Sequence, residues 1–373
     1  MSIHAATLSD RFLGTFFWSA TGDALGWPTK YASTYADRGL KPFYAHPVQN
    51  FVSWHLRDQV QPNVAELIAA GTYSAHTQLM LALARSVKPD GLLNPEQFAS
   101  VELPLWLQTA RAADDTSLAA ARNLLQSNAT WSQNFYSTPR CNYFQARTND
   151  ALVRSLPLVL TSLGDERRII LQTFLQTLIT HGHPQAILGT ILYALSLNFV
   201  LSSTSMLDGD ALLAYLANQL STIQQVGMDD ERLALWTPQW HEQTGQDFWL
   251  AWHTIAQDAL RNLDLIVSPI LPLSYYKRVG ARHPVTKDHT LPTISVALSL
   301  FYQYWQQPER ALLTAVDTFG SATNAIGACV GALLGALYGV SCTALPSSLP
   351  RTVQDSALLR DSALHLYAIA ARA

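Results

Sequence analysis

The sequence predicts an all-α fold, on three observations. Apolar residues recur mostly at the helical spacing i, i+3 and i+4, and the strict alternation of a half-buried strand is nearly missing. Prolines and Asp-Gly pairs separate the helical segments. Of the 373 residues, 49% are hydrophobic and 14% are charged, which allows a large core and excludes a disordered chain. Since no linker or repeat interrupts the pattern, we expect a single domain over residues 1–373.

The individual elements follow from these patterns in chain order. Helical spacing is clearest in four segments, at residues 79–84, 118–125, 171–179 and 212–223. The stretches 38–62 and 131–147 are the least helical and are rich in aromatic residues, Pro and Asn. Such composition is typical of long surface loops that are packed by their own side chains.

Near the end of the chain, glycines recur at every fourth position, at Gly327, Gly331, Gly335 and Gly339. This spacing places them on one face of a helix, where a neighbouring helix can approach closely. A glycine inside a helix costs about 1 kcal/mol relative to alanine, so tight packing must offset the loss. The pattern therefore predicts a central helix.

Several partners and locations are excluded by composition. Residues 169–207 and 325–345 are apolar and uncharged, but they lack the flanking basic clusters and aromatic belts of membrane spans, so we expect buried core helices and no membrane. A net charge of -3 without a basic run excludes nucleic acid. Three cysteines without metal spacing, and no signal-peptide pattern, predict a cytoplasmic protein.

Three separated segments resemble the ADP-ribosylglycohydrolase family. Residues 14–26, GTFFWSATGDALG, are similar to the family's opening helix, which ends in Gly-Asp-Ala-Leu-Gly. Residues 73–83, YSAHTQLMLAL, stand where the family has Tyr-Thr/Ser-Asp-Asp-Thr, and residues 320–339 stand where it has Gly-Gly-Asp-Thr-Asp-Ser/Thr and a glycine-rich helix. Lesser matches lie at residues 148–157 and 180–184. The resemblance implies a compact orthogonal helical bundle and an enzyme that removes ADP-ribose with two magnesium ions.

The carboxylates that the resemblance would assign to those ions are replaced. The Asp-Asp pair of the family reads Ala75 and His76, and the two aspartates of the last motif read Ala322 and Asn324. Lys30 stands near a position where the family often has an acidic residue. Hydroxyls, one amide and an imidazole do not make a cage for two hard cations. We therefore expect no metal site and no cofactor, with the fold retained.

A site shaped around positive charge can still accept an anionic ligand. We expect Lys30 or His76 to take over part of the electrostatic role of the missing cations, and we expect backbone N–H groups at a helix start to favour phosphate. An equally weighted alternative is that several of these residues only cap helices. The candidate ligand-binding residues are Lys30, Ser74, Thr77, Asn149, Arg154, Gly320, Ser321, Thr323 and Asn324.

Three hypotheses for function follow from the resemblance and the replaced residues. The first is a metal-free pseudoenzyme or diverged member that binds ADP-ribose, another nucleotide-like molecule or a protein in the former active cleft. The second is a hydrolase of ADP-ribosyl or related glycosidic bonds that works without magnesium, with His76 or Asp150 as general acid or base. The third is a structural or oligomeric scaffold.

Other conspicuous residues favour structural roles. Asp114, in a literal Asp-Asp-Thr, predicts a helix N-cap, and Asp23 predicts hydrogen bonds to neighbouring backbone or motif groups. His181 and His183 have no third ligand nearby and predict a structural turn. Tryptophans at roughly helical spacing predict packing between helices rather than a ligand cage; they are Trp236, Trp240, Trp249 and Trp252.

Overall fold

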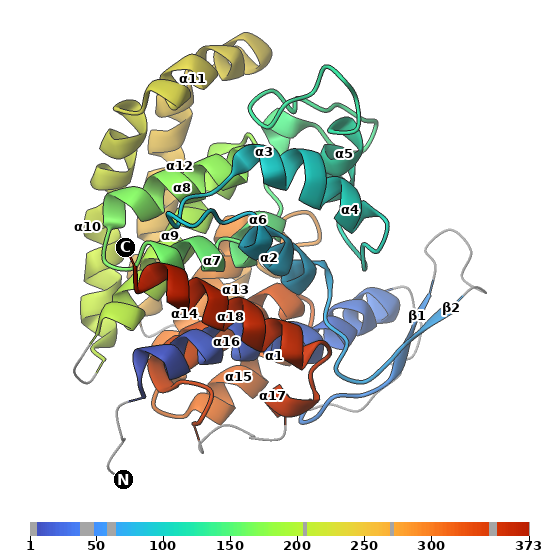
Figure 1. Ribbon diagram of the computed structural model, residues 1–373. Helices are drawn as coiled ribbons and strands as arrows, with labels where there is room; N and C mark the ends of the chain where they lie inside the picture. The colour runs from blue at the N-terminus through green and yellow to red at the C-terminus, as the bar shows by residue number, and fades with distance from the viewer. Residues whose placement is uncertain are drawn as a thin grey trace.

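Helices dominate the computed structural model, which describes residues 6–37, 48–57, 65–203, 207–268, 272–342 and 349–372 (Figure 1). The all-α prediction is confirmed. The helices are α1 (Leu8–Asp37), α2 (Ala75–Arg85), α3 (Pro95–Gln97), α4 (Leu103–Leu107), α5 (Asp115–Asn123), α6 (Asp150–Val153), α7 (Leu156–Thr161), α8 (Glu166–Leu178), α9 (Pro184–Ser202), α10 (Gly209–Met228), α11 (Glu231–Thr244), α12 (Phe248–Ile266), α13 (Pro272–Arg278), α14 (Thr290–Tyr304), α15 (Pro308–Val316), α16 (Thr323–Tyr338), α17 (Leu349–Thr352) and α18 (Ser356–Ala370). A π-helical turn spans Phe98–Glu102, and a 3₁₀ turn spans Tyr143–Gln145.

The four segments with the clearest helical spacing all fall on helices. They correspond to parts of α2, α5, α8 and α10, and most of their apolar positions are buried in one large core, although Leu125, just after α5, is exposed. Capping residues begin these helices, as when the Asp208 side chain accepts hydrogen bonds from the first N–H groups of α10. Local pattern and local caps therefore agree with the tertiary packing.

Two helices, α1 and α16, form the centre of the molecule by packing along a line of glycines. A Cβ added at Gly22 would overlap the carbonyl of Gly327, and one added at Gly331 would overlap the carbonyl of Trp18. A Cβ at Gly335 would overlap the carbonyl of Gly14 in the same way. The prediction of a central helix with a glycine face is thus confirmed.

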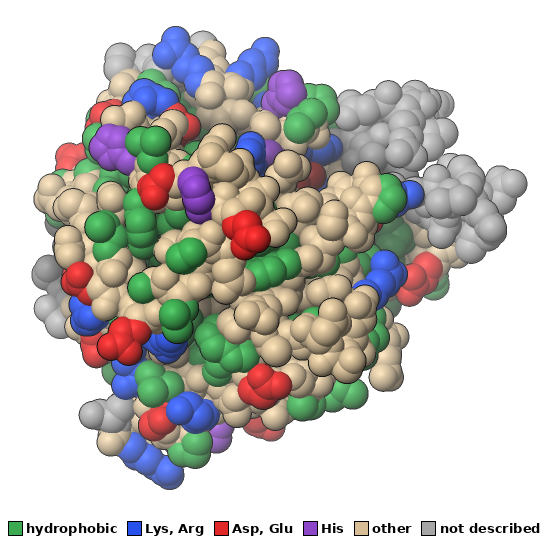
Figure 2. All heavy atoms as spheres, turned by 90° about the horizontal axis from the view of Figure 1, so that it is seen from above, with side chains coloured by type: hydrophobic (Ala, Val, Ile, Leu, Met, Phe, Trp, Pro, Cys, Tyr) green, Lys and Arg blue, Asp and Glu red, His purple; other side chains and the backbone are tan. Residues whose placement is uncertain are grey.

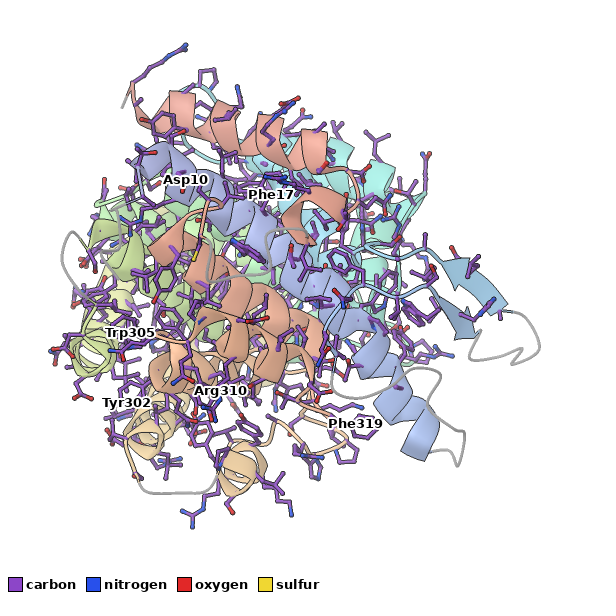
Figure 3. The ribbon with its side chains drawn as sticks, turned by 90° about the horizontal axis from the view of Figure 1, so that it is seen from below. Asp10, Phe17, Tyr302, Trp305, Arg310 and Phe319 are labelled. Atoms are coloured by element: carbon purple, nitrogen blue, oxygen red, sulfur yellow. The ribbon has the colours of Figure 1, made fainter. Side chains whose placement is uncertain are left out.

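Other helices surround this central pair. α14 and α15 pack on α16, and α18 runs beside the first half of α1, on which Asp10 and Phe17 lie (Figure 3). The hydroxyl of Tyr338, the last residue of α16, donates at 2.6 Å to the carbonyl of Trp305, which follows α14. Figure 3 shows Trp305 near Tyr302 and Arg310, where these helices come together.

α9 is the described helix that is long and apolar enough to cross a membrane, by length and composition. In the structure 83% of its apolar window is buried among other helices, including α8, α14 and α12. The expectation of a buried core helix is confirmed for this stretch. On the face shown in Figure 2, acidic and basic side chains are interspersed, without a continuous basic surface.

A small hairpin departs from the prediction of a loop over residues 38–62. β1 (Trp54–Arg57) pairs antiparallel with β2 (Ala65–Ile68), with Trp54 opposite Ile68. Trp54 packs edge-on against Trp27 of α1, with ring centroids 5.3 Å apart, and this contact buries one end of the hairpin. Strands of four residues are too short to show alternation in the sequence. Residues 48–53 of that predicted loop form neither helix nor strand, as expected, and residues 38–47 and 58–62 lie outside the described residues.

The aromatic residues of α11 and α12 pack against one another and against α8. Trp252 stacks on Phe174 with centroids 5.7 Å apart, and Trp236 and Trp240 meet Phe248 edge-on. Trp236, Trp240 and Trp252 are all buried. The prediction that these tryptophans pack helices together is confirmed.

Candidate functional site

Segments from several parts of the chain surround a cavity of about 890 Å³. Lys30 comes from α1, His76 from the start of α2, Asp114 from the cap of α5, Asp150 from α6 and Asn324 from α16. The loop before α14 closes another side. A cavity of several hundred Å³ with polar groups from several elements suits a small-molecule ligand.

Asp23 of α1 organises the motif at the start of α2. Its Oδ1 accepts a hydrogen bond from Ser74 Oγ at 2.5 Å, and its Oδ2 accepts from Thr77 Oγ1 at 2.7 Å. The backbone N–H groups of Ser74 and Thr77 also donate to Oδ2, each at 3.1 Å. The carboxylate is fully buried, so these bonds replace its lost hydration. The prediction that Asp23 bonds motif groups is confirmed.

The side-chain amide of Asn324 is oriented by this network. The hydroxyl proton of Ser74 is committed to Asp23, so Ser74 Oγ must accept from Asn324 Nδ2, which lies 3.1 Å away. The amide oxygen Oδ1 of Asn324 then points away from Ser74. It is buried and has no hydrogen-bond partner among the described residues. Asn324, which lines the cavity, therefore has a fixed amide whose oxygen is buried.

Lys30 brings a cation to the cavity together with its own counter-ion. Its Nζ lies 3.0 Å from Asp288 Oδ1, with side-chain exposures of 22% and 33%. Burial alone would lower the pKa of Lys30, but the Asp288 carboxylate raises it above the ordinary value. The pKa of Asp288 is lowered in turn, because Lys30 outweighs the effect of burial. Lys30 is charged in the folded protein.

Two carboxyl groups, those of Asp114 and Asp150, are joined by one serine. The N–H of Ser117 donates to Asp114 Oδ1 at 2.8 Å, and its hydroxyl donates to Asp150 Oδ2 at 2.6 Å. Burial raises the pKa of Asp114 well above its usual value, and the neighbouring Asp150 raises it further. Burial acts on Asp150 in the same direction, but His76 and hydrogen bonds from Asp114 and Ser117 lower its pKa overall. The pKa values of the two carboxyl groups are therefore shifted in opposite directions, upward for Asp114 and downward for Asp150.

His76 lies against this pair. Its Nδ1 is 3.6 Å from Asp150 Oδ1, which is longer than a hydrogen bond. The imidazole is buried, and Nδ1 has no hydrogen-bond partner among the residues described. Nδ1 is thus a buried polar atom that faces the Asp150 carboxylate.

Sequence analysis missed the place of Asp114. The predicted N-cap is confirmed, since the Asp114 side chain caps α5 through Ser117. The same carboxyl group also lines the cavity beside Asp150, which local sequence does not show because α5 and α6 are separate in the chain. The Asp-Asp-Thr sequence that begins at Asp114 was the feature of the sequence that could have pointed to a place at the cavity.

The predicted ligand-binding residues divide into two groups. Those that line the cavity are Lys30, Ser74, Asn149 and Asn324, together with the predicted catalytic residues His76 and Asp150. Asn149 is partly committed, because its Nδ2 donates to Thr293 Oγ1 at 2.8 Å.

The other predicted residues lie outside the cavity lining and bond within the protein. Thr323 donates to the carbonyl of Gly26 at 2.7 Å, and Ser321 to that of Thr318 at 2.5 Å. Gly320, at φ +86°, lies against the Arg282 side chain. Thr77 also lies outside the lining and donates to Asp23. The buried guanidinium of Arg154 donates to Gln176 Oε1 at 2.7 Å and to Thr180 Oγ1 at 2.5 Å.

His181 and His183 support a turn, as predicted. His181 lies between the hydroxyls of Thr148 and Thr180, at 2.9 and 2.7 Å. Its burial lowers its pKa to about 3, so the ring is neutral. His183 Nδ1 accepts from the N–H of Gln185 at 3.0 Å and begins α9.

The residues at the motif positions do not fit a pair of magnesium ions. Ala75 and Ala322 offer no side-chain donor, and Lys30 places an ammonium group in the cavity. Within the described ranges, no group of three or more His, Cys, Asp or Glu is placed to hold a metal ion. Two hard cations require several oxygen ligands, chiefly carboxylates.

Comparison with known proteins gives a family and a fold. The model of the ADP-ribosylglycohydrolase family matches residues 4–372. Among solved structures 46 chains match, and one of them, described as an "ADP-ribosylglycohydrolase-related protein complex", has 19% sequence identity and a TM-score of 0.66. The match covers 97% of this chain and 99% of that chain, and it shows a shared helical fold. No curated protein matches the sequence.

Proposed function

The chain belongs to the ADP-ribosylglycohydrolase family, and on that premise we propose that it is a diverged member, a metal-free pseudoenzyme that binds a small ligand in the former catalytic cleft. In this proposal, charged side chains of the protein take the place of the two magnesium ions on which the family depends. The proposal explains why the cavity is kept while the carboxylates at the motif positions are lost.

The observation that carries this proposal is the Lys30 ammonium group at the cavity. Its charge is held in place by Asp288 at 3.0 Å, and a fixed cation there opposes the approach of a divalent metal. Asp23, the carboxylate that remains in the motifs, is saturated by Ser74 and Thr77. Both observations support ligand binding that needs no magnesium.

A thermal-unfolding titration with ADP-ribose in EDTA tests the proposal. Ligand at 100 times its dissociation constant stabilises a protein by about 2.7 kcal/mol, which is a visible shift in Tm. We expect such a shift in EDTA, and we expect Lys30→Gln to remove most of it. The exposed Lys277 on α13 gives the matched control, Lys277→Gln. Stabilisation that requires added magnesium would overturn the proposal.

A second candidate function is favoured by the Asp114–Asp150 pair. Two carboxyl groups joined by Ser117, with the pKa of one raised and that of the other lowered, are the elements of acid–base hydrolysis. Asp150 would take a proton from water as the water oxygen bonds to the ligand carbon. Asp114 would give its proton to the leaving atom as the old bond breaks, so that water is consumed and the ligand is split in two.

Turnover of an ADP-ribosylated peptide in EDTA separates the two candidates. Product formation that is lost in Asp114→Asn and in His76→Ala would establish the hydrolase and reject the pseudoenzyme. Asp361→Asn, on the exposed side of α18, is the matched control. Binding without turnover in any variant supports the pseudoenzyme.

A further inference from the structure

Two residues that are not glycine take a positive φ, and a hydrogen bond joins the residues just before them. They are Ala112, at φ +47°, and Asp355, at φ +52°. The preceding residues are Arg111 and Gln354, and Arg111 Nη1 donates to Gln354 Oε1 at 2.8 Å. In the described part of the chain, the other residues with a positive φ are glycines. A residue with a Cβ rarely takes this conformation, so its surroundings must hold it there.

Tyr73 contacts both sides of this hydrogen bond. Its hydroxyl donates to Asp355 Oδ2 at 2.6 Å, and the guanidinium carbon of Arg111 lies 5.5 Å from the centre of its ring. Burial and the hydrogen bond to Asp355 raise the pKa of Tyr73 above its ordinary value, so the hydroxyl keeps its proton. The N–H of Gln354 also donates to the carbonyl of Gly71 at 2.9 Å. The segment before α18 is therefore fastened to the segment before α2.

These contacts continue directly into the cavity wall. Ser74 follows Tyr73 in the chain, Ala112 follows Arg111, and both Ser74 and Ala112 line the cavity. The backbone connects the same two segments, because the N–H of Ala75 donates to the carbonyl of Arg111 at 3.0 Å. A displacement of Arg111 would therefore reach the cavity lining through the adjacent peptide bond.

The conformation of Ala112 sets the direction of the chain at the rim of the cavity, which is formed here by Ala112 and Ala113. On one side, Ala112 packs on the apolar cluster of Trp27 and Trp54. On the other side, Asp114 follows two residues later, where it caps α5 and lines the cavity. A return of Ala112 to a negative φ would redirect the chain between these two fixed points.

We propose that Arg111 is a positioning residue of the ligand cleft, which holds Ala112 in its left-handed conformation through contacts with Tyr73 and Gln354. This inference rests on the proposed function, because the cleft that Arg111 shapes is the proposed ligand site. The lining of the cavity includes neither Arg111 nor Tyr73, so both act on a ligand through the rim. Through them, the segment before α18 takes part in ligand binding although it is far away in the sequence.

A rescue experiment separates positioning from a general effect on stability. Arg111→Met keeps the length of the side chain without its donors, and we expect it to weaken ADP-ribose by about fivefold in EDTA, measured by calorimetry on the full chain. Adding Ala112→Gly should restore the affinity to within about twofold, because glycine takes a positive φ without strain. Arg122→Met, on the exposed side of α5, is the matched control and should bind as the unmodified protein does. A loss of affinity that Ala112→Gly does not restore would overturn the inference.

A measurement without ligand keeps this inference separate from the proposed function. The methyl group of Ala113 lies at the cavity, so its NMR signal in protein labelled at alanine methyl groups reports the rim directly. We expect Arg111→Met to shift this signal and the added Ala112→Gly to reverse the shift. Tyr73→Phe removes only the hydroxyl, should move the signal in the same direction, and serves if Arg111→Met fails to fold. A signal that stays in place in the folded variants would contradict the proposed role of Arg111.

The two proposals can fail separately in these experiments. A rim that responds as expected, in a protein that does not bind ADP-ribose, would support the positioning role of Arg111 and reject ADP-ribose as the ligand. ADP-ribose affinity that is unchanged in Arg111→Met and in Tyr73→Phe would reject the positioning role and leave the metal-free cleft in place.

Discussion

Thr77 is joined twice to one oxygen of Asp23, through its hydroxyl at 2.7 Å and through its backbone N–H at 3.1 Å. The motif that resembles a metal-binding sequence thus holds α2 on α1 in this protein. Ser74 completes the same arrangement from the other side of the carboxylate. The residues that remain from the motif therefore contribute to stability.

Removing the Thr77 hydroxyl should destabilise the fold. Thr77→Val leaves the buried Asp23 carboxylate short of a charge-assisted hydrogen bond, and we expect the free energy of unfolding to fall by about 1.5 to 3 kcal/mol. Thr77→Ser keeps the hydroxyl and should lose less than half as much. Urea unfolding followed by circular dichroism measures both. Equal losses in the two variants would show that packing, and not the hydrogen bond, holds Thr77.

The Lys30–Asp288 pair should show measurable coupling. In a double-mutant cycle of Lys30→Gln and Asp288→Asn, we expect a coupling free energy of about 1 kcal/mol, because both side chains keep some solvent exposure. The cycle is measured by urea unfolding. Effects that add, within about 0.3 kcal/mol, would mean that the two groups do not interact in solution.

A methyl group on the glycine face of α16 should disrupt the contact with α1. Alanine normally stabilises a helix by about 1 kcal/mol relative to glycine, but Gly331→Ala would place Cβ on the carbonyl of Trp18. We expect a loss of about 1 to 3 kcal/mol, as for an overpacked core.

The exposed Ala214 of α10 calibrates that measurement. Ala214→Gly should cost about 1 kcal/mol from helix propensity alone. Thermal unfolding compares the two variants. A stabilised Gly331→Ala protein would show that α1 and α16 are not in close contact.

Stability should fall at acid pH through His181. Its pKa is lowered to about 3 in the fold, whereas an unfolded histidine has a pKa of about 6.5. Between these values the unfolded chain binds a proton that the folded chain does not, so stability is lost as pH falls. His181→Asn should reduce the slope of unfolding free energy against pH by up to about 1.4 kcal/mol per pH unit.

Urea unfolding at a series of pH values from neutral to acid measures this slope. Replacement of the exposed His365 on α18 provides the comparison. An unchanged slope in His181→Asn would mean that the ring is protonated in the fold or that its site opens before the protein unfolds.

Sequence predicted the fold well where the physical cause was local. The spacing of Gly327, Gly331 and Gly335 indicated close helix contact before the partner helix was known, because only a bare backbone face explains such a repeat. The short β1–β2 hairpin was not predicted, since Trp54 is ordered by its contact with Trp27, far from it in sequence.

The site was predicted only in part, because the contacts that complete it join segments far apart in the sequence. Family motifs placed His76, Asn324 and Lys30 at one cavity, but the partners that set their charge and orientation come from other segments. Asp288 pairs with Lys30, and Asp114 meets Asp150, only through tertiary packing.

Binding of ADP-ribose measured in parallel in EDTA and in excess magnesium tests the central claim, a metal-free cleft, most directly. Isothermal titration calorimetry on the full chain gives the affinity in each condition. The account predicts the same dissociation constant in both, and no heat from magnesium alone. Binding only in the presence of magnesium, abolished by Asp150→Asn, would show that the cleft holds a working metal site.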